Sequence, residues 1–416
     1  MYPTNQRHGD GAVSGSEGSS QRRVREGGDK KRKPIREESF PAELAFQWND
    51  FSYIDGIVDP YRKERAGPKG YPPSAILLMY LKEIRSVLGL VRFLTSNPEW
   101  LRTLGLKRRI NGTEVYSAPD RTGLYRLARR IGIDGMMRIL SVMVVRLMQR
   151  GVIRARSVSL DATIISAWFK DCRVRKDEQH LKRCRREVSK DRDAPWGYDH
   201  HRDRYVYGYK VHVLLDSETA LPVMLTVTAA GYGESRAVPW FVSMLLLLGV
   251  KAGKFFADMG YDSNEVRLLV TQKLKAVPFI PLQTRGARGT TPEEKKARRK
   301  LLCHRFYLKN FIHRFWVDPD SKRFDREYDA RTFSEQAFSV RKGSLDMDSL
   351  MHGGREWATL HSMAICVAML AVANTALDVG RPDLMRCVKC FNGQEVNYAQ
   401  PSVCQTTRKL AVAMDV

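Results

Sequence analysis

The sequence is poor in cysteine and in acidic residues. Its seven cysteines are scattered and odd in number, so a disulfide framework is not indicated, and reduced thiols inside a cell are the simpler expectation. Only 46 Asp and Glu residues stand against 70 Lys and Arg residues, which gives a net charge of +24. Such an excess favours a polyanionic partner, because neutralising phosphates releases condensed counterions. The composition therefore predicts nucleic acid as the partner; a merely basic soluble protein is the alternative.

Long uninterrupted apolar runs are also missing. The stretch 237–250 is apolar but too short to cross a bilayer. The stretch 360–379 is longer, yet it contains polar residues such as His361 and Asn374, which favour a buried core helix. The first residues are polar and rich in Gly and Ser, unlike a secretory leader. We therefore expect no membrane contact and a cytoplasmic protein that is associated with the nucleoid when bound to DNA.

Changes in composition divide the chain into four parts. Residues 1–38 are rich in Gly, Ser, Lys and Arg and have almost no large apolar groups, which predicts a disordered basic tail. Residues 39–150 contain several helix start signals with apolar residues at helical spacing, which predicts an all-helical N-terminal domain for DNA binding or dimerisation. Residues 151–380 form the predicted catalytic domain, with a basic insertion at about 285–325, and 381–416 form a C-terminal tail.

The order of elements within the third part predicts an α/β fold. Strand-like runs precede helix-like runs, and the two types then alternate, which is typical of a mixed sheet flanked by helices. The expected strands cover 156–163, 207–215, 221–228, 254–258 and 276–280, and the expected helices cover 236–249, 263–273, 331–343 and 353–378.

Two aspartates close predicted strands. Asp161 follows Ser159-Leu160, and Asp258 follows Phe256-Ala257. A carboxylate at a strand end is unfavourable unless something requires it, because Asp is disfavoured in strands and a buried charge is costly. Two such groups on neighbouring strands would repel each other, and a divalent cation such as Mg²⁺ removes that repulsion. With a third carboxylate the site could hold two Mg²⁺ ions, with Mn²⁺ as a substitute. The alternative is that both are turn or capping residues.

A third acidic position lies in a segment that places Tyr328, Arg331, Glu335 and Lys342 at intervals of three, four and seven residues. On a helix the last three share one face. A carboxylate flanked by two cations suits a metal ligand with phosphate-binding neighbours. The alternative is an ordinary Arg–Glu surface pair, which contributes little.

Other candidate metal ligands are weaker. Glu356 is the second choice for the third carboxylate, and Asp262 and Asp346 are further rivals. Cys387 and Cys390 form a single CxxC, which is weak support for zinc because no second ligand pair accompanies it.

Taken in order, these motifs resemble those of DDE-type insertion-sequence transposases. The spacing over 328–342 matches the Tyr-Arg-Glu-Lys signature of that group. The residues around Asp161 and Asp258 resemble its first and second Asp motifs, and 207–212 looks like the strand between them. Residues 70–122 are similar to the helical N-terminal domain common in these proteins.

The resemblance implies an RNase H-like fold and an enzyme that cuts and joins double-stranded DNA. Metal-dependent phosphodiester hydrolysis and strand transfer would occur at the ends of an insertion sequence. Asp161, Asp258 and Glu335 would be the catalytic metal ligands. A homodimer is expected in the DNA complex, because two transposon ends must be paired and joined to a target.

The resemblance also implies DNA contacts. Tyr328, Arg331 and Lys342 would touch the DNA end near the cleaved phosphate. Relatives often have Asn-x-His-Asp/Glu-Ser where this chain has Gly233 and Glu234 before a Ser, so the role of that loop stays open. The basic insertion is short for an extensive β-domain.

Two other functions remain compatible with the sequence. A catalytically inactive DNA-binding protein derived from a transposase would have the same charge and the same helical block. A general RNase H-like nuclease would account for the two aspartates but not for the Arg-Glu-Lys segment. The intact set of carboxylates favours the transposase.

Overall fold

The structure describes most of the chain between residues 71 and 388. It is a computed structural model, and the described residues are 71–72, 74–169, 191, 193–199, 203–284, 287–331 and 345–388. The predicted tail over 1–38 lies outside these residues, as do Glu335, Lys342 and most of the predicted C-terminal tail. The domain boundaries drawn from composition stay predictions.

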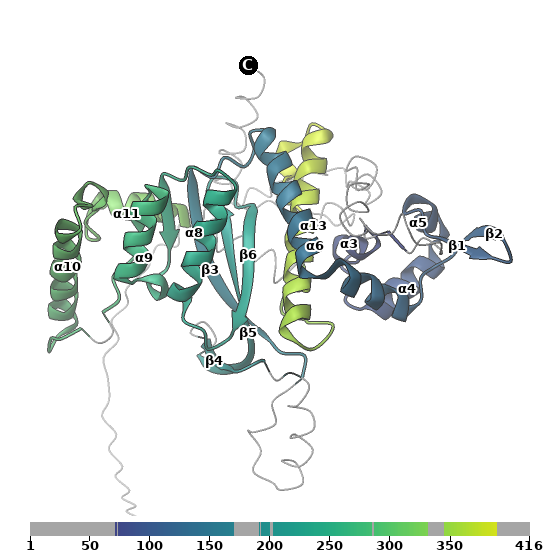
Figure 1. The fold of residues 1–416 in the computed structure, drawn as a ribbon, viewed down its shortest axis with the longest axis horizontal. Coiled ribbons are helices and arrows are strands. Elements are labelled where there is room, and N and C mark those ends of the chain that lie inside the picture. The colour runs from purple at the N-terminus through teal and green to yellow at the C-terminus, as the bar shows by residue number, and fades with distance from the viewer. Residues whose placement is uncertain are drawn as a thin grey trace, which may run out of the picture. The chain divides into compact units, whose positions relative to one another are not determined.

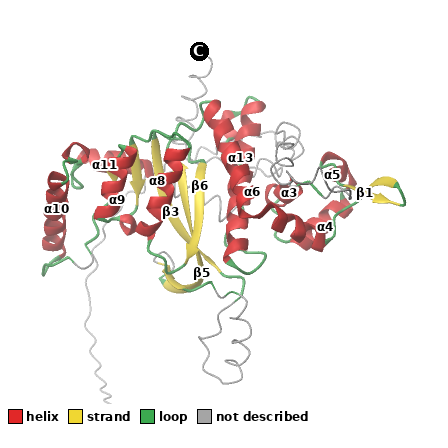
Figure 2. Ribbon diagram, viewed as in Figure 1, coloured by secondary structure: helices red, strands yellow, loops and turns green. Residues whose placement is uncertain are grey.

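A mixed sheet carries the fold, and Figure 2 shows its long strands in yellow. Its order is β4-β5-β3-β7-β8, and β6 also pairs with β5. β3 runs antiparallel to β5 and parallel to β7, and β7 runs parallel to β8. The strands are β3 (Ser157–Ser166), β4 (Trp196–Asp199), β5 (Arg204–Asp216), β6 (Pro222–Ala229), β7 (Lys254–Ala257) and β8 (Val277–Phe279). The predicted mixed sheet flanked by helices is confirmed; its assignment as RNase H-like stays a prediction.

The long strands β3 and β5 are buried on both faces. One row of alternate residues in each strand is apolar, as at Val158 and Leu160 of β3 and at Val211 and Val213 of β5, and most residues of the other row are buried as well, which suits a sheet that is covered on each side. The two backbones approach closely at Gly208, where an added Cβ would lie 2.0 Å from the carbonyl oxygen of Ile165. Only glycine fits there, so its place in the Tyr-Gly-Tyr stretch is a packing requirement.

The turn between β5 and β6 is held by one buried carboxylate. Asp216 accepts hydrogen bonds from the backbone N–H and the hydroxyl of Thr219, at 3.0 and 2.6 Å, and from the N–H of Ala155 at 2.9 Å. Burial raises the pKa of Asp216 to about 6. The group therefore belongs to the fold of this turn.

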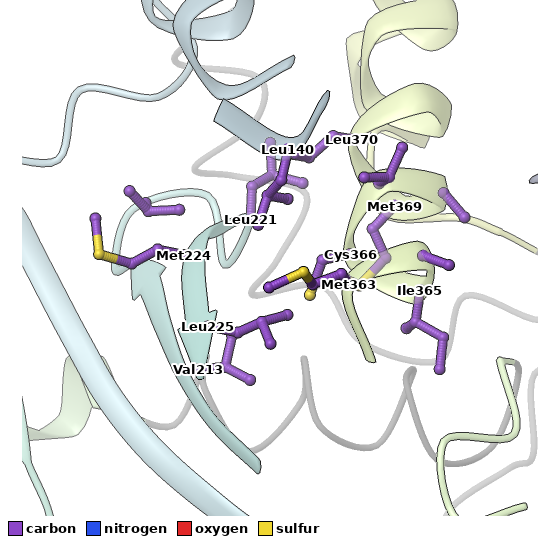
Figure 3. Close-up of a cluster of buried hydrophobic side chains, with 14 of the residues drawn as sticks. Leu140, Val213, Leu221, Met224, Leu225, Met363, Ile365, Cys366, Met369 and Leu370 are labelled. Atoms are coloured by element: carbon purple, nitrogen blue, oxygen red, sulfur yellow. The ribbon is translucent and has the colours of Figure 1, made fainter. Parts of the chain in front are cut away.

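Two helices, α6 (Arg121–Gln149) and α13 (Arg355–Asp378), cover one face of the sheet. They lie side by side in Figure 1, and each contacts the other and β6. Figure 3 shows Met363 and Cys366 of α13 next to Leu225 of β6, with Leu140 of α6 in the same buried cluster. α13 is long and apolar enough to cross a membrane, but 94% of its apolar window is buried inside the protein. It is therefore a core helix of this fold.

Shorter helices follow β6 and β7. They are η2 (Glu234–Ala237), α8 (Val238–Leu247), η3 (Met259–Tyr261), α9 (Asn264–Leu269) and η4 (Val270–Leu274). α8 and α9 contact each other. Phe241 of α8 and Val266 of α9 pack in the same hydrophobic core as the strands of the sheet. The predicted helices over 236–249 and 263–273 are confirmed with shorter bounds.

The N-terminal part of the described chain contains α3 (Ser74–Leu81), α4 (Val87–Ser96) and α5 (Pro98–Thr103). The expectation that this part is entirely helical was wrong. Strands β1 (Lys107–Ile110) and β2 (Thr113–Tyr116) form an antiparallel hairpin. Its turn is Asn111-Gly112, whose φ angles of 50° and 83° are those of the turn that an Asn-Gly pair favours. This local signal outweighed the helical pattern around it.

The basic insertion is helical where it is described. It contains α10 (Pro292–Lys309), η5 (His313–Phe315) and the start of α11 (Lys322–Tyr328), which is followed by η6 (Asp329–Arg331). A capping box between Thr291 and Glu294 fixes the start of α10. The last short helix, η7 (Pro382–Leu384), follows α13.

Candidate active site

Asp161 and Asp258 lie beside each other on neighbouring parallel strands. Leu160 of β3 is in register with Ala257 of β7. Asp161 and Asp258 are the residues that directly follow this pair. The prediction that Asp161 closes its strand was wrong, because β3 continues to Ser166 through its pairing with β5; Asp161 lies inside the strand and is only 8% exposed. Asp258 caps η3 by accepting a hydrogen bond of 2.9 Å from the N–H of Gly260. The sheet thus brings together two carboxylates that are far apart in the sequence.

The surroundings of both aspartates disfavour two negative charges. Burial, followed by the charges of Glu234 and Asp161, raises the pKa of Asp258 to about 7. Burial also raises the pKa of Asp161, against the opposite effect of Arg331. Like charges in a poorly solvated place repel unless a cation lies between them. The pair is therefore suited to hold a cation.

Arg331 and Tyr328 reach the same place from η6 and from the end of α11. Arg331 Nη2 lies 3.4 Å from Asp161 Oδ2, and Arg331 Nη1 donates to the Tyr328 hydroxyl at 3.3 Å. That hydroxyl in turn donates to the carbonyl oxygen of Ala257 at 3.3 Å. Two of the three predicted DNA-contacting residues therefore border the aspartates. Glu335 and Lys342 lie outside the described residues.

Glu234 is a further carboxylate at this site. It is the first residue of η2, and its Oε1 pairs with Lys210 Nζ of β5 at 2.9 Å. A Cβ added to Gly260 would lie 1.9 Å from Glu234 Oε2 and 3.1 Å from Asp258 Oδ1, so both carboxylates border one point. The Glu-Ser pair in the loop was the signal in the sequence, but only the fold brings it to the aspartates.

A buried hydrogen-bonded chain supports the loop that carries Asp258. His212 on β5 contacts the Tyr261 hydroxyl through Nδ1 at 3.0 Å and the Thr228 hydroxyl through Nε2 at 2.9 Å. Burial, with the charge of Lys210, lowers the pKa of His212 to about 3, so the ring is neutral. The neutral ring ties the loop to the middle of the sheet.

The rival carboxylates have other surroundings. Asp262 is fully buried and pairs with Arg267 at 2.9 Å and with Arg299 at 3.0 Å, which makes it part of the fold. Asp346 lies 3.4 Å from Arg85. Glu356 is exposed in the first turn of α13. None of the three contacts Asp161 or Asp258 within the described part of the chain.

The net charge of the site favours binding of a metal ion. Asp161, Asp258 and Glu234 face two cations, Lys210 and Arg331, so one negative charge is unbalanced, and carboxylate oxygens are the ligands that Mg²⁺ prefers. Among the described residues no group of three or more His, Cys, Asp or Glu side chains is arranged to hold a metal ion. The residues present fit a divalent ion that takes part of its coordination from the DNA, from water or from a further carboxylate.

The fold and the site define an α/β protein with an acidic centre where two parallel strands meet. A family model described as a transposase DDE domain matches residues 158–371, more than half of the chain, and the chain belongs to this family. The match includes both aspartates, Glu234 and Arg331. Members of the family generally use divalent metal ions, and membership supports a transposase that acts on DNA. No curated protein and no solved structure matches the chain.

Proposed function

We propose that this protein is a DNA transposase that cleaves and joins phosphodiester bonds at the ends of an insertion sequence. The observation that carries the proposal is the meeting of Asp161 and Asp258 next to Arg331, whose guanidinium lies 3.4 Å from Asp161. Paired carboxylates with an adjacent cation suit a scissile phosphate, because the acids hold metal and the cation attracts the phosphate oxygens. The family match supports the same reaction class.

Asp161, Asp258 and Glu335 are the proposed ligands of two Mg²⁺ ions, which Mn²⁺ can replace. When bound, such ions supply an activated water or 3′-hydroxyl and stabilise the leaving oxygen. The protein's own contribution is to fix the aspartates through the sheet and to hold Arg331 against Asp161 through Tyr328. Lys342 is the third proposed contact to the DNA end.

The proposed partners are the two ends of the element and a target duplex. Because two ends must be joined to one target, we propose that a homodimer assembles on the DNA. The protein would act in the cytoplasm at the nucleoid. Zinc binding by Cys387 and Cys390 has no support beyond their spacing: Cys387 is disulfide-bonded, contrary to the expectation of reduced thiols, and Cys390 lies outside the described residues.

The decisive experiment uses the full chain with a supercoiled plasmid that carries the element and its flanking DNA. Asp161→Asn, Asp258→Asn and Glu335→Gln should each abolish Mg²⁺-dependent nicking and strand transfer while DNA binding stays within about twofold. Asp325→Asn removes an exposed carboxylate from α11 and serves as the matched control. Cleavage at the wild-type rate by all three variants would overturn the assignment.

The same assay separates the two alternatives. A DNA-binding protein without activity would bind the ends but leave the plasmid supercoiled with either metal. A general nuclease would nick DNA without joining ends to a target. Strand-transfer products that depend on both aspartates would exclude both.

A further inference from the structure

An open cleft lies between η4 and the turn that follows α10. Its volume is about 390 Å³, and its polar lining includes Lys273, Lys275, Asn310 and Arg314. None of the residues that line it is acidic. The cleft therefore presents three cations and the amides of Gln272 and Asn310 to a ligand.

These cations differ from those nearby on α10. Lys296 pairs with Asp320 at 2.6 Å and Lys300 pairs with Asp318 at 2.7 Å, so two carboxylates balance the two cations. In the described part of the chain, Lys273, Lys275 and Arg314 have no carboxylate partner, and all three are exposed. Uncompensated positive charge is thus concentrated at the cleft, where it attracts phosphates.

Phe311 stands at the same cleft and is 94% exposed, more than the other exposed large apolar side chains of the described chain. Its φ angle of 56° is in the left-handed region, which is unusual for a residue other than glycine. The turn is nevertheless well anchored, because the N–H of Phe311 donates to Leu308 O and the next residue, Ile312, is buried. A rigid turn therefore holds an aromatic ring out in solvent.

The cleft lies away from the acidic centre. β7 and β8 are parallel, Asp258 follows the end of β7, and Lys275 precedes the start of β8. The two features are therefore at opposite ends of these strands, separated by roughly 10 Å or more at about 3.3 Å per strand residue. A ligand of the cleft would not occupy the catalytic position itself.

We propose that this cleft binds single-stranded or unpaired DNA, with Lys273, Lys275 and Arg314 on the phosphates and Phe311 stacked on a base. Exposed aromatic rings beside cations are the combination that holds unpaired strands, since every base has a face on which to stack. The inference rests on the proposed function, because it places a second DNA contact on an enzyme whose reaction exposes broken strands. It assigns to Phe311 a role that packing does not explain.

The test measures fluorescence anisotropy of a labelled single-stranded oligonucleotide and of a blunt duplex of the same sequence, with the full chain. Phe311→Ala should weaken binding of the single strand by about tenfold and leave duplex binding within about twofold. Leu301→Ala is the matched control, because Leu301 is an exposed apolar residue too, but lies on α10 and does not line the cleft. An unchanged affinity for the single strand, or equal losses on both DNAs, would overturn the stacking role.

The cations are tested by the combined change Lys273→Gln, Lys275→Gln and Arg314→Gln. This variant should weaken binding of the single strand and reduce the dependence of its affinity on salt, by about 0.7 in the logarithmic slope for each phosphate that is no longer neutralised. Lys296→Gln removes a charge that is already paired, and should change the slope least. A slope equal to that of the wild type would overturn the role of these cations in binding phosphate.

The result of the cleft-binding test can be distinguished from the result of the cleavage test of the proposed function. Asp161→Asn should lose cleavage and keep its affinity for the single strand, so failure of the proposed reaction leaves the binding test intact, and Leu301→Ala, which lies outside the cleft, should keep both properties. Thermal melting of Phe311→Ala should match the wild type because the ring is exposed. A change in oligomeric state by light scattering, with unchanged DNA affinity, would show a protein interface instead and overturn the inference.

Discussion

Lys210 of β5 holds Glu234 of η2 through an ion pair of 2.9 Å between Nζ and Oε1. The two side chains are only 12% and 21% exposed, so this pair is less screened than a surface pair. Arg331 balances Asp161 in a similar way at 3.4 Å. Among the described residues no cation forms an ion pair with Asp258. Of the three carboxylates at the site, its negative charge is therefore the least balanced.

Glu234→Gln should slow catalysis without preventing DNA binding. The change keeps the size of the side chain but removes the charge that borders Asp258, and loss of such a neighbour typically costs about 10- to 100-fold in activity or metal affinity. The measurement is the single-turnover nicking rate as a function of Mn²⁺ concentration. The control Glu327→Gln removes a carboxylate that pairs with Lys254. Equal metal dependence for wild type and Glu234→Gln would contradict a role for Glu234.

Asp258→Asn should stabilise the protein in the absence of metal. It removes one of the repelling charges and keeps the oxygen that accepts the Gly260 N–H, so we expect a gain of about 1 kcal/mol, or roughly 2 to 4 °C in Tm. Thermal melting in a chelator measures the gain. Added Mg²⁺ should stabilise the wild type more than the variant. A lower Tm for the variant in chelator would count against charge repulsion at this site.

Acid should destabilise the fold through His361. This buried residue contacts the Tyr80 hydroxyl at 2.9 Å through Nδ1, and burial lowers its pKa to about 4. The unfolded chain binds a proton near pH 6.5 and the folded chain does not, so stability falls as pH drops from about 6.5 to about 4, by roughly 3 kcal/mol.

Denaturant unfolding at several pH values measures this loss. His361→Gln cannot take up the proton, so its stability should fall less over the same range. Asp216 acts in the opposite direction, because its raised pKa favours the folded state as pH falls below about 6. Comparing the two proteins at each pH isolates His361, and parallel curves would contradict the prediction.

Asp262→Ala should destabilise the fold strongly. The carboxylate is fully buried, pairs with Arg267 and Arg299, and accepts the backbone N–H of Gln283 at 2.8 Å. Its removal leaves the buried guanidinium of Arg267 without its acid, which typically costs about 3–5 kcal/mol. Chemical denaturation measures the loss, and Asp325→Ala on α11 is the exposed control. A loss no larger than that of the control would mean that the buried pair contributes little.

Much of the sheet could be predicted because most of its strands are short runs of apolar and β-branched residues, which are recognisable in the local sequence. The runs that became β3, β5, β6, β7 and β8 are β-branched and apolar, and each ends near a turn residue. The two aspartates were recognisable because an acid at the end of such a run is out of place unless it has a function. The Asn111-Gly112 pair is also a local hairpin signal, but the prediction of an all-helical part followed the helical patterns on either side of it.

The sequence by itself determined most of the strands, the two aspartates associated with them and the excess of positive charge, because these depend on residue type and on spacing along the chain. Only the tertiary structure decided which acids meet. Register between β3 and β7 brings Asp161 to Asp258, the return of the chain at η2 adds Glu234, and burial with two arginines makes Asp262 structural. Contacts between distant segments depend on how strands pair and helices pack, which no local pattern specifies.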